Sequence, residues 1–186
     1  MTIDEREICR YLRLHGRAPG EALEERIKAM REAALKAIRP ARVWRRFDDP
    51  FVAGGADSKT LKRHLAECHA AYLVCTTIGA EFDTLQRRTA ATSPADAFVL
   101  QAIGAAAIEE WTDETEREIR RELKEDETLV SRYSPGYGDW PLEAQRRLFE
   151  LLDAPRKVGV SLTDSLLMVP SKSVSAIIGV KTEVSQ

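Results

Sequence analysis

The sequence predicts an α+β fold in which several helices pack on a small mixed sheet. Up to Pro155, most apolar residues recur at helical spacing. The apolar run from Ala70 to Ile78 becomes β-branched toward its end and precedes Gly79, which is typical of a buried strand. Beyond residue 157 the pattern changes to that of short extended segments. The 186 residues suit one domain that buries a core without disulfides or metals.

Two helices are expected at the N-terminus. Thr2 and Glu5 have the spacing of a capping box, and the first helix runs from there to about Leu14. Pro19 opens the second helix and Pro40 ends it. The second helix has a regular apolar face: Leu23, Ile27, Met30, Ala34 and Ile38.

A strand, a loop and two shorter helices are expected next. The alternation in Ala41–Phe47 favours a strand, and the Pro and Gly residues of segment 48–57 indicate a loop. Ser58 caps a helix whose apolar face extends to Cys68. After the buried strand, residues 80–90 form a short helix. Its inward positions are Phe82 and Leu85.

The longest predicted helix begins at Ser93 and Pro94, where Ser is the cap and Pro occupies the first turn. It runs to about Lys124. The small residues Gly104–Ala107 indicate a closely packed neighbour. The apolar positions of the helix are Phe98, Ile103, Ala107, Ile108, Trp111, Ile119 and Leu123.

The C-terminal part begins with an ordered loop, Arg132–Pro141, because no regular helix or strand suits its Pro, Gly and aromatic residues. Pro141 then opens an amphipathic helix that ends before Pro155. The remaining elements are short: extended segments at 158–162 and 166–169, a turn at 170–173, and a returning strand at 174–178.

The loop Arg132–Pro141 is the main candidate for binding. Arg132 offers a planar fork for a carboxylate or a phosphate. Gly136 and Gly138 allow positive φ or close approach of a ligand to the backbone. Three rings offer flat faces to a ligand ring or a cation: Tyr133, Tyr137 and Trp140. Equally, the loop could be a connector between helices whose rings fill the core.

Composition excludes several classes of protein. The net charge of −2 indicates neither a nucleic-acid-binding nor a membrane-binding surface. The acidic N-terminus does not resemble a signal peptide, and the apolar run 97–108 is too short to span a bilayer, so a cytoplasmic protein is expected. The three cysteines have no paired spacing and predict no disulfide: Cys9, Cys68 and Cys75.

Common catalytic motifs are missing or weak. Gly79-Ala80-Glu81 is a poor dinucleotide motif, and the sequence has neither a phosphate loop nor a nucleophile elbow. His64 and Cys68 would share a helical face and could form a metal pair, but no second pair accompanies them. An acid–base pair could come from four residues that more simply form a solvated helix face: Glu109, Glu110, Asp113 and Glu114. No Asp-x-His-x-x-Gly run is present to supply a ligand to a corrinoid cobalt.

Two stretches that follow one another along the chain carry a family resemblance. Arg132-x-x-x-Gly136-Tyr137 resembles the S-adenosylmethionine-contacting motif of the activation domain of cobalamin-dependent methionine synthase. Residues 162–175, with Leu162-Thr163-Asp164-Ser165, Met168, Pro170 and Ser173-Val174-Ser175, resemble the hairpin of that domain. Weaker similarity extends back to about Tyr72. The chain is most similar to short, free-standing relatives of the domain.

The resemblance implies a twisted, mainly antiparallel sheet flanked by helices, with a C-terminal β-hairpin. It implies one activation-like domain over 1–186, with 1–57 as an N-terminal appendage and 58–186 as the core. It also implies S-adenosylmethionine as the cofactor and cobalamin only through a partner. The partner would be a corrinoid-binding protein or methyltransferase, as in a split methionine synthase, with a reductase or flavodoxin as electron source.

The resemblance also implies roles for four residues. Arg132 would bind the ligand's carboxylate, and Gly136 would allow close approach to the backbone. Tyr137 would face the adenosyl group or the sulfonium. Glu110, or alternatively Glu109, would face the cationic end of the ligand.

The sequence departs from the family pattern at residues 138–140. Family members commonly read Gly-Tyr-Pro-Ala-Cys-Pro, whereas this chain has Gly-Asp-Trp at the three middle positions. The large enzyme also contributes an N-terminal aspartate and tyrosines beyond the hairpin, which have no match here. Three functions therefore stay open: an S-adenosylmethionine-binding component of a cobalamin-dependent methyltransferase rather than a complete enzyme, a docking module without that ligand, and a small-anion or metabolite binder using Arg132.

Overall fold

A four-stranded sheet forms the centre of the computed structural model, which describes residues 3–183. Its strand order is β1-β2-β6-β3, and each pairing is antiparallel. The sheet is therefore antiparallel, as the resemblance implies, and not mixed, as the apolar pattern alone favours. The strands are β1 (Ala41–Phe47), β2 (Cys68–Thr77), β3 (Glu127–Leu129) and β6 (Ser173–Thr182).

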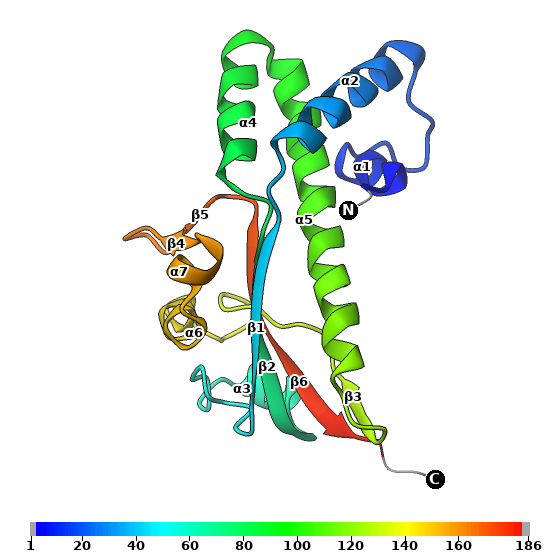
Figure 1. Ribbon diagram of the computed structural model, residues 1–186. Helices are drawn as coiled ribbons and strands as arrows, with labels where there is room; N and C mark the ends of the chain where they lie inside the picture. Colours follow the sequence, from blue (N-terminus) through cyan, green and yellow to red (C-terminus); the bar gives the residue numbers. More distant parts are fainter. Residues whose placement is uncertain (1–2, 184–186) are drawn as a thin grey trace.

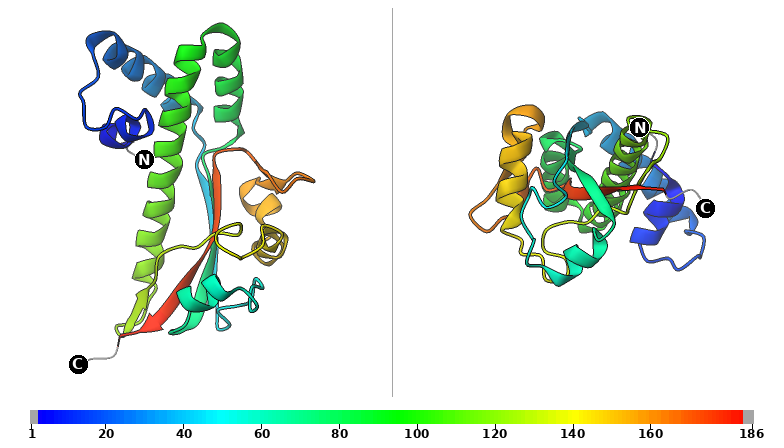
Figure 2. Two further views of the ribbon diagram at one scale, coloured as in Figure 1. Left: turned by 180° about the vertical axis from the view of Figure 1, so that it is seen from behind. Right: turned by 90° about the horizontal axis from the view of Figure 1, so that it is seen from below.

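Helices cover both faces of this sheet (Figure 1). The long helix α5 lies along one face, and α3, α6 and α7 lie on the other, as the view from behind also shows (Figure 2). α1, α2 and α4 pack around the N-terminal half of α5. The helices are α1 (Glu5–Tyr11), α2 (Glu21–Ala37), α3 (Lys59–His64), α4 (Ala80–Thr92), α5 (Pro94–Arg121), α6 (Ala144–Leu152) and α7 (Ala154–Val158).

The alternation of β2 and β6 divides the core between the two faces. Tyr72 and Ile178 pack with Ile119 of α5 on one face. Leu73 and Ile177 pack with the helices of the other face. Because β2 and β6 are apolar on both sides, helices have to cover both faces, and this places α5 opposite α3 and α6.

Two of the predicted helix caps are confirmed by the structure. Ser58 caps α3 by accepting a hydrogen bond from the Leu61 N–H at 3.0 Å, and Ser93 caps α5 in the same way. The predicted capping residue Thr2 lies outside the described residues, and Asp4 caps α1. The prediction that α3 extends to Cys68 is wrong, since α3 ends at His64 and Cys68 begins β2.

The small-residue patch of α5 has the predicted neighbour. Gly104 lies against α4, where an added Cβ would be 2.5 Å from the Phe82 ring. Phe98, one of the apolar positions of the predicted helix, is 60% exposed.

The C-terminal hairpin is present as β4 (Ser161–Leu162) and β5 (Met168–Val169). The returning strand, β6, does not continue this hairpin but crosses the molecule between β2 and β3. The expected extended segment at 158–162 is wrong at its start, since Val158 ends α7.

No helix within the described part of the chain is long and apolar enough to cross a membrane. All three cysteines are free thiols.

Candidate functional site

The loop Arg132–Pro141 leaves β3 along the edge of β6. Val130 N donates to the Gly179 carbonyl at 3.0 Å, and Tyr133 and Ile177 exchange backbone hydrogen bonds of 2.8 and 2.9 Å. The segment thus continues the sheet as an irregular edge strand, and consecutive side chains point to opposite faces. Arg132 reaches the α5 face, whereas Tyr133 packs with the core of the opposite face.

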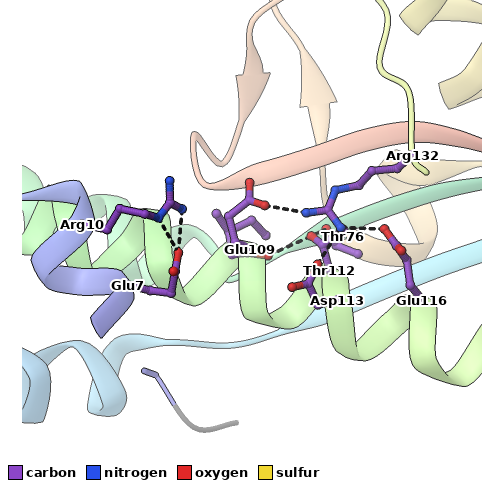
Figure 3. A network of polar contacts seen from close by, with 9 residues as sticks. Glu7, Arg10, Thr76, Glu109, Thr112, Asp113, Glu116 and Arg132 are labelled. Atoms are coloured by element: carbon purple, nitrogen blue, oxygen red, sulfur yellow. Dashed lines mark hydrogen bonds and ion pairs between the residues drawn. The ribbon is translucent and has the colours of Figure 1, made fainter. Parts of the chain in front are cut away.

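Arg132 is held by three carboxylates of α5 (Figure 3). Its Nη2 is 2.5 Å from Glu109, and its Nη1 is 2.6 Å from both Asp113 and Glu116. These carboxylates recur at helical spacing and therefore share one face of α5. Burial alone lowers the pKa of Arg132, but Glu116, Asp113 and Glu109 outweigh it, so the net pKa is raised and the guanidinium stays charged.

The helix α5 that carries these carboxylates is fixed to the sheet directly beneath them. Thr112 Oγ1 lies 2.8 Å from Thr76 Oγ1 of β2, and both side chains are fully buried. Thr112 also donates to the Ile108 carbonyl, and because a hydroxyl has a single hydrogen, Thr76 is then the donor to Thr112. This contact ties the middle of α5 to β2 and so fixes the acidic face relative to the sheet.

The other half of the loop is anchored to the start of α3. The Asp139 carboxylate accepts hydrogen bonds from Ser58 Oγ at 2.5 Å, from the backbone N–H groups of Lys59 and Thr60, and from Thr60 Oγ1. These contacts, led by those from Ser58 and Thr60, hold the pKa of Asp139 well below its usual range.

The neighbours of Asp139 also serve the fold. Trp140 is buried in the core opposite α5, and an added Cβ at Gly138 would collide with Thr60. Residues 138–140 therefore depart from the family pattern where the loop packs inward. In this chain, Asp139 anchors the loop to the start of α3, and Trp140 anchors it in the core.

Gly136 and Tyr137 form the tip of the loop. Gly136 has φ +91°, and its N–H donates to the Trp140 carbonyl at 2.9 Å, so the backbone there requires glycine. Tyr137 is 66% exposed, with its ring centroid 6.1 Å from that of Tyr133. The rings offered as ligand surfaces therefore separate into Tyr137, which is exposed, and Trp140, which fills the core.

Glu110 is not part of the Arg132 cluster. Its carboxylate pairs with Arg117 at 2.7 Å, whereas the neighbouring Glu109 contacts Arg132. Both glutamates, with Asp113, line a cavity of about 230 Å³ between α5 and α1. The α1 side supplies Asp4, Glu7 and Arg10, of which Glu7 and Arg10 are paired at 2.6 Å (Figure 3).

Two contributors escaped the sequence analysis. Glu116 continues the helical spacing that begins at Glu109, and this spacing could have indicated it. Asp4 enters the cavity only because α1 packs across α5, which no local pattern encodes.

The possible metal pair is not assembled. His64 lies at the end of α3, with Nε2 2.7 Å from the Ser131 carbonyl and its ring 4.9 Å from that of Tyr133. Cys68 lies on β2, where burial raises the pKa of its thiol. Within residues 3–183, no group of three or more His, Cys, Asp or Glu side chains is placed to hold a metal ion.

The chain was compared with known protein families, curated proteins and solved structures. The model for the activation domain of vitamin B12-dependent methionine synthase matches residues 65–186, a range that includes Arg132, Gly136, Tyr137 and Glu110. A comparison with curated proteins found no match. Among solved structures, the chain is similar to "Crystal Structure of the MetH Reactivation Domain bound to AdoHcy", with 22% identity and a TM-score of 0.47. That similarity covers 63% of this chain and 41% of the solved chain.

Proposed function

The chain belongs to the family of activation domains of vitamin B12-dependent methionine synthases, and from this we propose that it binds S-adenosylmethionine for reductive methylation of a partner's cobalamin. In this role the chain is an accessory component and not a complete methyltransferase. The observation that carries the proposal is the charged Arg132, presented at the sheet edge beside the acidic face of α5 and the exposed Tyr137.

The donor set fits the ligand chemically. S-adenosylmethionine carries a carboxylate, an ammonium group, a sulfonium and an adenine ring. Arg132 supplies a bidentate cation, and Glu109 and Asp113 supply negative charge within the same cluster. The Tyr137 ring is free to contact a cation or the adenosyl group. Glu110, which lines the neighbouring cavity, would have to leave Arg117 to meet the ligand.

The chain's own residues would bind and orient the methyl donor. When bound, S-adenosylmethionine supplies the methyl group, and the corrinoid on the partner protein accepts it. Arg132 and Glu109 would fix the amino-acid end of the ligand, and the Gly136 backbone would allow close approach. The sheet edge and α5 give these groups a rigid base, as positioning requires.

The proposed reaction requires two partners. A corrinoid-binding protein or methyltransferase would present its cobalamin to the ligand, and a reductase or flavodoxin would supply the electron.

A small-anion site at Arg132 is disfavoured, because one guanidinium faces three carboxylates and the ionised cluster carries a net charge of −2.

A docking module without the ligand is the second candidate. It is favoured by one observation, namely that protein carboxylates already satisfy Arg132. Arg132 would then have the purely structural role of fastening the loop to α5.

Calorimetric titration with S-adenosylmethionine separates the two candidates. We expect saturable binding by the wild-type chain and at least a tenfold loss of affinity in Arg132→Ala, about 1.4 kcal/mol or more. Arg147→Ala is the matched control, since Arg147 is an exposed arginine paired with Glu150 on α6. Absence of heat and of a thermal shift up to millimolar ligand would favour the docking module. Unchanged affinity in Arg132→Ala would refute the assignment of Arg132 to the carboxylate.

A further inference from the structure

The three carboxylates on Arg132 are not equivalent. Glu116 is the most enclosed, with a side chain 14% exposed, whereas Glu109 is 39% and Asp113 is 51% exposed. Asp113 also shares Nη1 with Glu116, while Glu109 contacts Nη2 by itself. Removing Asp113 would therefore leave Arg132 held at both nitrogens by the other two residues.

This arrangement makes ligand binding an exchange. A ligand carboxylate that approaches Arg132 from solvent meets the guanidinium where Asp113 already occupies it. An exposed carboxylate is the least costly to release, because water solvates it again. Glu116 is enclosed and would keep Arg132 in position during the exchange. Asp113 is thus the competitor, and Glu116 is the anchor.

Once displaced, Asp113 stays next to the bound ligand. It lines the same cavity as Glu109 and Glu110, so its charge would face the amino-acid end and the sulfur. S-adenosylmethionine has a positively charged sulfonium there. In methyl transfer the electron pair of the broken carbon–sulfur bond stays on sulfur, and the product S-adenosylhomocysteine has a neutral thioether. Both ligands keep the α-ammonium group, but only S-adenosylmethionine adds a sulfonium charge that attracts the displaced carboxylate.

We propose that Asp113 is a specificity-determining residue, which competes with the ligand carboxylate for Arg132 and favours the sulfonium ligand over its thioether product. The inference rests on the proposed function. For the product, the attraction to Asp113 lacks the sulfonium contribution and offsets the competition less, so Asp113 returns to Arg132 more readily and promotes product release. For the methyl donor, attraction by Asp113 opposes the competition.

The test is calorimetric titration of Asp113→Asn with both ligands. We expect S-adenosylhomocysteine to bind more tightly and S-adenosylmethionine to change less, so that the preference for the sulfonium falls about three- to tenfold. The matched control is Glu114→Gln. It removes the same charge at the next residue, and the Glu114 side chain makes no ion pair within the described residues. Glu114→Gln should leave the preference within about twofold, because solvent and salt screen its charge.

A further variant and the binding of both ligands by the wild-type chain decide between the possible explanations. Asp113→Glu keeps the charge and should retain the preference. If Asp113→Asn weakened the binding of both ligands by the same factor, Asp113 would only support the fold, and the proposal would be overturned. A preference unchanged in Asp113→Asn, in a protein that binds both ligands, would overturn this inference alone. Absence of binding by the wild-type chain would overturn the proposed function, and this inference with it.

Discussion

At the scale of single residues, the molecule stabilises its charged groups by local compensation. Arg132 carries three carboxylates, and Asp139 accepts hydrogen bonds from the first turn of α3. Glu127 is a third charged group with local compensation, and its side chain is only 2% exposed. Arg46 contacts it through two nitrogens at 2.8 and 2.5 Å, and His69 contacts it at 3.1 Å.

We predict that Glu127→Gln lowers the free energy of unfolding at neutral pH by about 2 kcal/mol, because Arg46 loses a charged partner. Arg46 above all holds the pKa of Glu127 below its usual range. The ionised acid therefore contributes stability above its unfolded pKa of about 4.3, and this contribution is lost as pH falls through the lower folded value.

Urea unfolding between pH 7 and pH 3 tests this prediction. Wild-type stability should fall more steeply with acid than that of Glu127→Gln. Glu150→Gln is the control, because Glu150 is exposed and its pair with Arg147 should contribute little. Parallel acid profiles for wild type and Glu127→Gln would show that the ion pair does not stabilise the fold.

At the scale of elements, α5 organises the molecule. It contacts α1, α2 and α4 with its N-terminal half and supplies the acidic face to Arg132 with its C-terminal half. Its close approach to α4 depends on Gly104. A Cβ there would lie 2.5 Å from the Phe82 ring and 2.9 Å from Lys172 Cε.

We predict that Gly104→Ala destabilises the protein by about 1–3 kcal/mol through overpacking, although alanine favours a helix by about 1 kcal/mol. The measurement is thermal or urea unfolding. In a Phe82→Leu background the same substitution should cost less, since the ring that it would strike is gone. An increase in stability on Gly104→Ala alone would refute the close packing of α4 on α5.

At the scale of the whole molecule, we propose that residues 1–186 form one folding unit. Segment 1–57 includes β1, which pairs with β2 from Ala41↔Thr77 to Phe47↔Ala71. Ile8 and Ile27 are buried in one cluster with Leu100 and Ile103 of α5. The segment expected as an appendage thus shares both the sheet and a core cluster with residues 58–186.

We predict that a fragment of residues 58–186 is much less stable than the full chain. It would expose the edge of β2 and the apolar face of α5, which favours aggregation. Circular dichroism during urea unfolding, with sedimentation to detect association, measures this. A monomeric fragment that unfolds as cooperatively as the full chain, at a similar midpoint, would instead support a separable appendage.

Much of the fold could be predicted from the sequence. The strand Ala41–Phe47 agrees with the prediction, as do the caps at Ser58 and Ser93. Predictions failed where a short-range pattern continued across a boundary set by packing. Cys68 continues the apolar face of α3, but pairing with β6 draws it into β2. β3 is only three residues long and lacks a local signal, so it was missed.

Most element types, the ordered loop and the residues of the family motif could be predicted from the sequence alone, because caps, apolar periods and turn residues act over a few neighbours. Which carboxylates meet Arg132 depends on the tertiary structure. Glu109 contacts it and the adjacent Glu110 does not, because successive residues of a helix point about 100° apart. The position of α5 on the sheet sets that rotation, and it depends on contacts between residues far apart in the chain, such as Thr76 with Thr112.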